Sequence, residues 1–241
     1  MPTVTVVQLS DTHLVADPNG VVSGRNTQDR LMSVLAAVRE RVARPDLVLL
    51  TGDNADDGSI EACRRLRDTV SELGAPQFAI AGNHDLPAPV AATFGGADHA
   101  EVGTWRVVGL VSAVPDQIAG RVDADAALDR IDALDDRPTI VAIHHPPRSN
   151  STHPWFVLDG AEALLEGLAD RPHVIAVVSG HVHEAFDLSG PGQLRLLGAP
   201  STFVAFRHRG DEFEIGDVGP TGARLLHLHD DASLTTELIE A

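Results

Sequence analysis

The chain has 241 residues, of which 43% are hydrophobic, and its 18 basic residues, all arginine, stand against 35 acidic ones for a formal net charge of −17. The apolar fraction is that of an ordinary folded protein and excludes a disordered chain. The negative charge would repel long polyanions, so we expect no duplex nucleic acid as a partner, and a small anionic substrate would need a local positive centre.

Three further features bear on where the protein works. No apolar run reaches the roughly 18 residues that a membrane span needs. The start of the chain, MPTVTVVQLSD, lacks the basic and long apolar regions of a signal peptide. The single cysteine, Cys63, cannot form an internal disulfide and lies in a helical pattern, where a small core residue is expected. We therefore expect a cytoplasmic protein.

In chain order, β-branched apolar runs alternate with apolar residues at helical spacing. We predict a strand at Thr3–Leu9, a helix at Gln28–Val42, a strand at Asp46–Leu50, a helix at Ser59–Leu73, strands at Gln77–Ala81 and Trp105–Leu110, a helix at Ala124–Leu134, a strand at Thr139–Ile143, a helix at Gly160–Ala169 and a strand from Val174. Several short strands are expected after Leu194. This order predicts an α/β fold in one domain over residues 1–241, with loops at 87–99 and 146–159 that cover a site.

Polar side chains follow five of these strands at the point where each strand ends. They are Asp11 and His13, Asp53, Asn83 and His84, His144 and His145, and His181 and His183. Ligands bind outside the carboxyl ends of strands in open α/β sheets, so we expect these groups on one rim. Taken singly, most have simpler explanations as caps or turn residues. The pair His181 and His183 is not easily explained as caps or turn residues, because alternate residues of an extended segment face the same side.

In this order the motifs D-x-H at 11–13, G-D at 52–53, G-N-H-D at 82–85, H at 144 and G-H-x-H at 180–183 resemble the signature of the calcineurin-like metallophosphoesterases. The strings TGDNADDGSIEA at 51–62, HHPP at 144–147 and APSTFVAF at 199–206 are similar to the class III cyclic nucleotide phosphodiesterases of that superfamily. The likeness covers nearly the whole chain. It implies the metallophosphoesterase fold, a four-layer α/β/β/α sandwich of two mixed sheets, where the residues alone predict only an α/β fold with converging strand ends.

The resemblance also implies a dinuclear metal centre. Asp11, His13 and His183 would hold one ion. Asn83, His144 and His181 would hold the other, and Asp53 would bridge both. Imidazole, carboxylate and amide donors without a thiolate suit iron, manganese, zinc or cobalt, and the sequence does not choose among them. Two such ions would lower the pKa of a bridging water and so supply the hydroxide that attacks phosphorus.

Three residues within these motifs have expected roles other than metal binding. By the resemblance, His84 would contact the phosphate and donate a proton to the leaving oxygen, and the alternative is that it only braces the Asn83 loop. Asp85 is expected to orient His84 or to cap the next turn. His145 is expected either to lie behind the metal ligands or to pack behind the Pro146–Pro147 turn, rather than to bind an ion.

Four more residues lie close to the motifs. Asp56 and Asp57 are interpreted as turn and helix-start residues of the string DDGSIEA. His153 and Trp155 lie in the loop after HHPP, where an aromatic ring could stack on a nucleobase or another leaving group, or could simply pack.

The leading hypothesis is therefore a metal-dependent phosphodiesterase that acts on a small phosphodiester such as a 3′,5′-cyclic nucleotide. The first alternative is a phosphomonoesterase. The segment Asn54–Asp57 and the residue Asp85 depart from the pattern of the phosphatases and so count against this alternative. The second is a binding scaffold without chemistry, which usually lacks part of the ligand series. Many members of the resembling family dimerise, so a homodimer is an open expectation.

Overall fold

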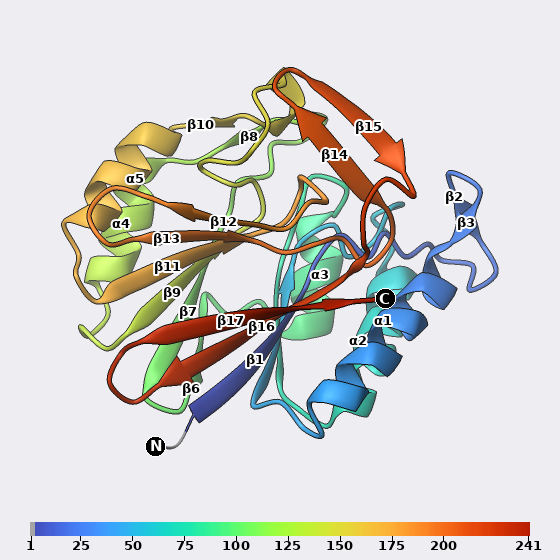
Figure 1. Cartoon of the computed structure of the whole chain (residues 1–241), viewed down its shortest axis with the longest axis horizontal. Helices are drawn as coiled ribbons and strands as arrows, with labels where there is room; N and C mark the ends of the chain where they lie inside the picture. The colour runs from blue at the N-terminus through green and yellow to red at the C-terminus, as the bar shows by residue number, and fades with distance from the viewer. Residues whose placement is uncertain (1–2) are drawn as a thin grey trace.

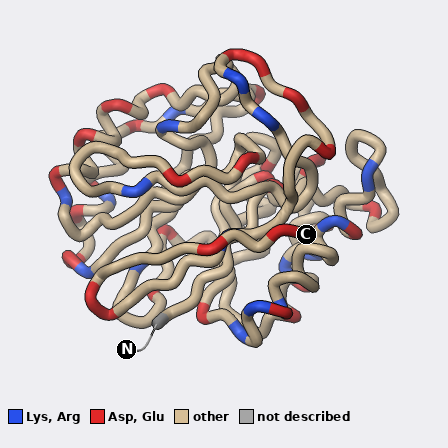
Figure 2. Tube along the Cα trace, viewed as in Figure 1, with Lys and Arg blue, Asp and Glu red and all other residues tan. Residues whose placement is uncertain are grey.

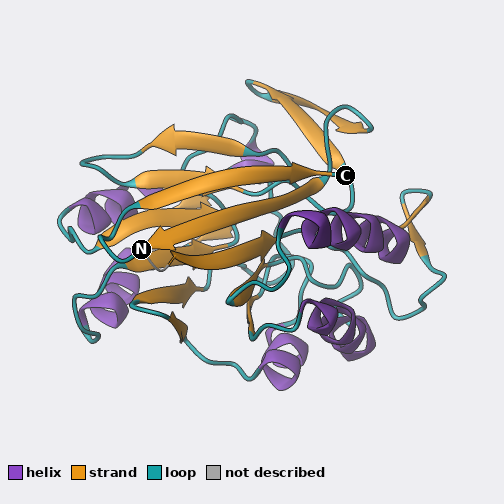
Figure 3. Cartoon of the chain, turned by 60° about the horizontal axis from the view of Figure 1, so that its bottom comes forward, coloured by secondary structure: helices purple, strands orange, loops and turns teal. Residues whose placement is uncertain are grey.

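The structure, a computed structural model, describes residues 3–241 and consists of two β-sheets packed face to face with helices on both outer sides. Turned on its side, the molecule shows the strands as a central block with helices flanking it (Figure 3). The fold expected from the resemblance, a sandwich of two mixed sheets, is confirmed. The expectation that the chain starts without a signal peptide rests in part on Met1 and Pro2, which lie outside the described residues.

The first sheet has five strands in the order β17-β16-β1-β4-β5. The strands are β1 (Thr3–Leu9), β4 (Leu47–Thr51), β5 (Gln77–Ile80), β16 (Gly222–His229) and β17 (Leu234–Glu240). Strands β1, β4 and β5 run parallel, while β16 pairs antiparallel with β1 and β17. The sheet is therefore mixed, and its three parallel strands end at the same edge.

The second sheet has six strands in the order β12-β13-β11-β9-β7-β6. They are β6 (His99–Val102), β7 (Trp105–Leu110), β9 (Thr139–Ile143), β11 (Val174–Ser179), β12 (Phe186–Ser189) and β13 (Arg195–Gly198). The four central strands are parallel and the two edge strands antiparallel. Central strands with both faces covered explain why their sequences are continuously apolar.

Helices cover the outer face of each sheet (Figure 1). The first sheet packs against α1 (Thr27–Arg41), α2 (Ile60–Val70) and α3 (Pro87–Phe94), and the second against α4 (Ala124–Asp132) and α5 (Ala161–Ala169). Strand β4 shows how one sequence serves two layers. Val48 and Leu50 pack toward α1 and α2, while Leu47 and Leu49 face the core between the sheets. Alternation of period two thus divides an apolar run between two cores.

Short elements surround the sandwich. Two hairpins, β2 (Val21–Val22) with β3 (Arg25–Asn26) and β14 (Ala205–Arg209) with β15 (Glu212–Gly216), project beyond it, and β8 (Gly120–Arg121) pairs with β10 (Leu158–Asp159). Two 3₁₀ turns complete the elements, η1 (Ser71–Leu73) and η2 (Pro154–Phe156). Charged residues lie mainly on the outer helices, hairpins and loops, and the inner strands carry few (Figure 2).

The predicted strands and helices are all present within a few residues, and one expectation is wrong. The segment 87–99 is not simply a loop over a site, because helix α3 occupies Pro87–Phe94 and packs against α2 and β5. Proline occupies the first turn of α3, where its missing N–H costs no helical hydrogen bond. Among residues 3–241, no helix combines the length and the apolar character that crossing a bilayer requires.

Candidate metal centre

The parallel strands of both sheets end at one rim, and each end carries predicted site residues. Asp11 and His13 follow β1, Asp53 follows β4, Asn83 and His84 follow β5, His144 follows β9, and His181 and His183 follow β11. The structure brings all of them together. The Asp53 carboxylate oxygen Oδ2 lies 3.6 Å from His13 Nε2 and 3.4 Å from His144 Nε2. Asp11 Oδ1 lies 3.5 Å from His183 Nε2, and His144 Nε2 lies 3.2 Å from Asn83 Oδ1.

Donor atoms of several subsets lie close enough to share one ion. Asp11, His13 and His183 form one such group, and Asp11, Asp53 and His144 form another. His181 is grouped with His144 and His145. Because Asp53 lies between His13 on one side and His144 on the other, it is the central carboxylate of the cluster.

The backbone at the strand ends is held in an unusual conformation. Asp11, His13, Asp53, His181 and His183 all have positive φ angles, between 47° and 68°. This left-handed region is rarely adopted by non-glycine residues and costs free energy, so it tends to be found where function requires it. Hydrogen bonds hold it here. Asp11 N donates to Gly52 O at 3.0 Å, and His181 N donates to the Asp11 carboxylate at 3.0 Å.

Glycines let the strand ends approach one another. A Cβ on Gly82 would overlap the Asp53 carboxylate and backbone nitrogen, and a Cβ on Gly180 would overlap the side chains of Ser10 and Asp11. The glycines of the G-N-H-D and G-H-x-H motifs are therefore required by close packing between segments far apart in the sequence.

Each predicted histidine ligand has one ring nitrogen held by a second group. His144 Nδ1 donates to Thr51 O at 2.8 Å, His183 Nδ1 to Val204 O at 2.9 Å, and His181 Nε2 to Trp155 O at 2.9 Å. His13 Nδ1 contacts Asp56 Oδ1 at 2.8 Å. Metal-binding histidines are held in the same way, with one nitrogen oriented by a carbonyl or carboxylate and the other left for the ion. The donor set therefore fits divalent metal ions.

Burial and neighbouring charges shift the acidities of the cluster. Burial by itself would raise the pKa of Asp11, but the His183 imidazole beside it holds that pKa down at about 2. Burial opposes ionisation of Asp53 too, and His144 and His13 keep its pKa well below its usual range. Burial and the neighbouring His144 lower the pKa of His181 to about 3, which leaves its ring neutral and able to bind metal.

His84 stands apart from the buried donors, because 42% of its side chain is exposed. Its Nδ1 lies 3.3 Å from Asp56 Oδ1, and this contact raises the pKa of His84 to about 9. Its backbone N–H donates to Asp53 Oδ1 at 2.9 Å. His84 therefore presents an imidazole of raised pKa beside the cluster and open to the cavity.

Asp56 is a residue whose importance local sequence reasoning missed. It occupies a turn, as expected, but its carboxylate contacts both His13 and His84. No local signal distinguishes it from Asp57, which accepts hydrogen bonds from the backbone N–H groups of Ala16 and Ser59. The partners of Asp56 come from other strand ends, so only the folded chain reveals them.

The expectations for Asp85 and His145 have different outcomes. Asp85 neither orients His84 nor caps α3, and that expectation is wrong. Its buried carboxylate accepts hydrogen bonds from the backbone N–H groups of Asn54, Ala55 and Gly82, and burial raises its pKa to about 6. Both ring nitrogens of His145 already have partners, Ser112 Oγ at 2.8 Å and Ile118 O at 2.9 Å, as expected of a residue behind the metal ligands.

A cavity of about 220 Å³ opens above the cluster. Its floor is formed by donor residues and His84, and its wall by side chains that are mostly apolar, Val22, Ile118, Trp155, Phe203, Phe206 and Ile215. The segment 146–159 does cover the site, as expected, because it supplies Trp155 and Phe156. Trp155 lines the cavity but His153 does not.

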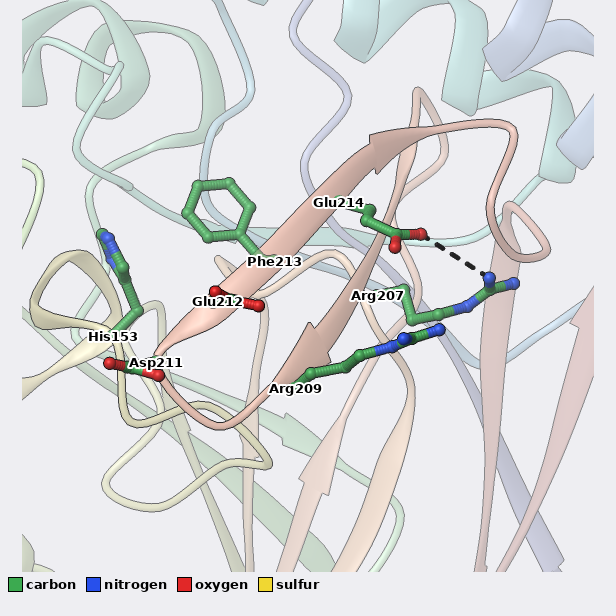
Figure 4. A pocket seen from close by; sticks show the side chains of 7 residues that line it. All are labelled: His153, Arg207, Arg209, Asp211, Glu212, Phe213 and Glu214. Carbon is green, nitrogen blue, oxygen red and sulfur yellow. Dashed lines mark ion pairs between the residues drawn. The ribbon is translucent and has the colours of Figure 1, made fainter.

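A second hollow of about 350 Å³ lies on the β14–β15 hairpin. Figure 4 shows Arg207, Arg209, Glu212 and Glu214 along this hairpin, with Arg207 paired to Glu214 and His153 facing Phe213. Although this hollow is the larger, it contains no residue of the cluster. The smaller cavity above the donors is therefore the candidate active site.

The chain is similar to several known proteins. The sequence model of the calcineurin-like phosphoesterases matches residues 4–185. A 3′,5′-cyclic adenosine monophosphate phosphodiesterase, CpdA, of Pseudomonas aeruginosa is 38% identical over 97% of this chain and 88% of its own length. A probable cyclic nucleotide phosphodiesterase of Synechococcus is 36% identical over 98% and 92%. Among solved structures, a dimetal phosphatase from Danio rerio shares the fold with a TM-score of 0.72 at 15% identity, covering 100% of this chain and 97% of its own.

Proposed function

The chain belongs to the calcineurin-like phosphoesterase family and is a phosphoric ester hydrolase; we propose that its substrates are 3′,5′-cyclic nucleotides and that it opens their cyclic phosphodiester. The observation that carries the proposal is a complete cluster of donors beneath a small cavity, in a chain that matches curated cyclic nucleotide phosphodiesterases over nearly its full length.

We assign the donors to two metal ions. Asp11, His13 and His183 would hold one ion, Asn83, His144 and His181 the other, and Asp53 would contact both. The oriented imidazoles and the low pKa values of Asp11 and Asp53 support this assignment. Bound ions would supply Lewis acidity toward the phosphate and lower the pKa of water at the site. Iron, manganese, zinc and cobalt all suit such donors.

We assign to His84 the proton donated to the leaving ester oxygen. Its raised pKa keeps the ring protonated at neutral pH, and its exposure to the cavity leaves a nitrogen free for substrate. Asp56 orients this ring and stabilises its charge. The bound ions and the His84 imidazolium would then balance the negative charge of the substrate at the site, despite the net charge of −17 on the whole chain.

We expect no binding of duplex nucleic acid, because the cavity is small and the surface strongly acidic. A homodimer stays a prediction.

The test is turnover of cyclic AMP by metal-loaded protein, with 5′- or 3′-AMP separated by chromatography. A matched pair of substrates, bis(p-nitrophenyl) phosphate and p-nitrophenyl phosphate, compares a diester with a monoester of the same leaving group. We expect cyclic AMP to be hydrolysed and the diester to be preferred. Hydrolysis of the monoester alone would instead establish a phosphomonoesterase.

A further inference from the structure

The wall of the cavity has a chemical character that the metal cluster does not explain. Among residues 3–241, no arginine lines the cavity, and the chain has no lysine, so the wall offers no cation to a second phosphate. Instead, Ile118, Trp155 and Ile215 expose 41%, 46% and 54% of their surfaces around it. Large apolar side chains gathered at the mouth of a cavity mark a binding surface rather than ordinary surface composition.

Three wall segments accept hydrogen bonds through their backbone carbonyls, two from histidines of the floor and one from His145 behind it. Ile118 O accepts from His145 Nε2 at 2.9 Å, Trp155 O from His181 Nε2 at 2.9 Å, and Val204 O from His183 Nδ1 at 2.9 Å. These hydrogen bonds fix the position of the wall segments relative to the floor.

Trp155 is the largest of these side chains, and other rings support it from behind. Its ring centroid lies 5.2 Å from that of His153 and 5.6 Å from that of Phe213. These two supporting rings also contact each other edge to face, with their centroids 5.0 Å apart (Figure 4). An indole held in this way presents a rigid flat surface with little conformational entropy to lose when a ligand stacks on it.

We propose that this wall binds the nucleoside part of the substrate by stacking and apolar contact, with Trp155 as its principal contact, and that it does not distinguish bases by hydrogen bonds to their edges. This inference rests on the proposed function and adds to it the way in which the nucleoside part of the substrate is recognised. Base–aromatic stacking tolerates any base because every base has a π-face. A substrate with one phosphoryl group is preferred, since a second would find no cation.

The test uses tryptophan fluorescence, because the chain has only two tryptophans and Trp105 is fully buried. Titrating metal-loaded protein with the product 5′-AMP should quench the Trp155 emission. In Trp155→Phe, which keeps only Trp105, the quench should disappear. Persistence of the full quench in that variant would overturn the proposal.

Steady-state kinetics provide a second readout. Trp155→Ala should raise KM for cyclic AMP about tenfold, the effect of losing one stacking contact, while kcat changes little. Trp155→Phe should restore most of the loss. Val157→Ala is the matched control, because Val157 lies in the same loop, is 49% exposed and does not line the cavity. Its KM should equal that of the wild type.

Base recognition is tested by comparing cyclic AMP with cyclic GMP. We expect kcat/KM values within about tenfold, since stacking alone separates the two purines weakly. A preference above a hundredfold, or an unchanged KM in Trp155→Ala, would refute the inference while leaving the phosphodiesterase assignment intact. If the protein hydrolysed bis(p-nitrophenyl) phosphate but no cyclic nucleotide, the proposed function would fail. The KM of Trp155→Ala for that aryl diester would still test whether Trp155 binds the aromatic part of a substrate.

Discussion

At the scale of single residues, the site depends on side chains that hold other side chains. A donor that must bind an ion or move a proton needs a fixed orientation and protonation state, and a hydrogen bond to its far nitrogen provides both. Backbone carbonyls do this for His144, His181 and His183, whereas His13 uses the carboxylate of Asp56. Asp56 also contacts His84, so one carboxylate serves a metal donor and an acid.

Replacing Asp56 tests this at one position. Asp56→Asn should lower kcat by about 10- to 100-fold, the usual loss when a group that orients a metal ligand is removed. Because the Asp56 contact raises the pKa of His84 to about 9, its loss should let that pKa fall toward 6.5. Activity that needs protonated His84 would then decline at a lower pH, which a pH–rate profile of both proteins would reveal.

The neighbouring carboxylate is the control for that measurement. Asp57→Asn removes an equal charge one residue away, from a side chain that bonds only backbone N–H groups and Ser59. Its pH profile should match that of the wild type. If activity declined at the same alkaline pH in Asp56→Asn as in the wild type, Asp56 would not be the group that raises the pKa of His84.

At the scale of elements, the site is a meeting of strand ends, and its spacing depends on residues without side chains. The end of β11 crosses the end of β1 at Gly180, next to Ser10 and Asp11. The φ of Gly180 is not positive, so alanine could adopt its backbone conformation. The need for glycine here is therefore entirely one of space, in contrast to Gly52, whose φ is +97°.

Gly180→Ala should separate the two strand ends. The overlap with Ser10 and Asp11 predicts a loss of about 1–3 kcal/mol of stability, as in other overpacked sites. It also predicts bound metal well below the wild-type content, measured by elemental analysis of dialysed protein. Gly219→Ala is the control, since a Cβ there meets only Ala205 at 3.5 Å. Equal metal content in the two variants would contradict this account of the crossing.

At the scale of the whole molecule, function requires that two sheets keep a fixed relation, because each supplies part of the donor set. The core between them is apolar, but Arg224 adds a polar connection. It leaves β16 of the first sheet and donates to Gly198 O and Phe186 O of the second, at 2.8 Å each. No carboxylate of the described part of the chain contacts its side chain, which is almost fully buried, and burial lowers its pKa to about 10.

Arg224→Met should destabilise the protein by about 1–3 kcal/mol, because buried carbonyls lose a charged donor. The midpoint of urea denaturation measures this loss. Arg121→Met serves as the control, since Arg121 and its partner Asp159 are largely exposed and such pairs contribute little. If the two variants unfolded at the same urea concentration, Arg224 would not be a connection between the sheets.

The amino-acid sequence by itself determined most helices and strands and the positions of the donors at the strand ends. Apolar runs of period two and 3.6 are local properties, so β1, β4, β9, β11 and the main helices follow from it within a few residues. The rule that ligands bind at the carboxyl ends of strands then predicted one rim for Asp11, Asp53 and His144. Short, polar or proline-containing elements such as α3 and the β2–β3 hairpin were not predicted, because their local patterns resemble those of loops.

Only the tertiary structure decided which groups touch. The partnership of Asp56 with His13 and His84, the backbone role of Asp85 and the apolar wall around Trp155 all join segments that lie far apart in the chain. Hydrogen bonds and stacking act over a few ångströms, and sequence spacing carries no information about such distances once the chain has turned. These distances depend on the strand order of the two sheets. The donors could be placed at strand ends from the sequence, but the residues that orient the donors could not be identified from it.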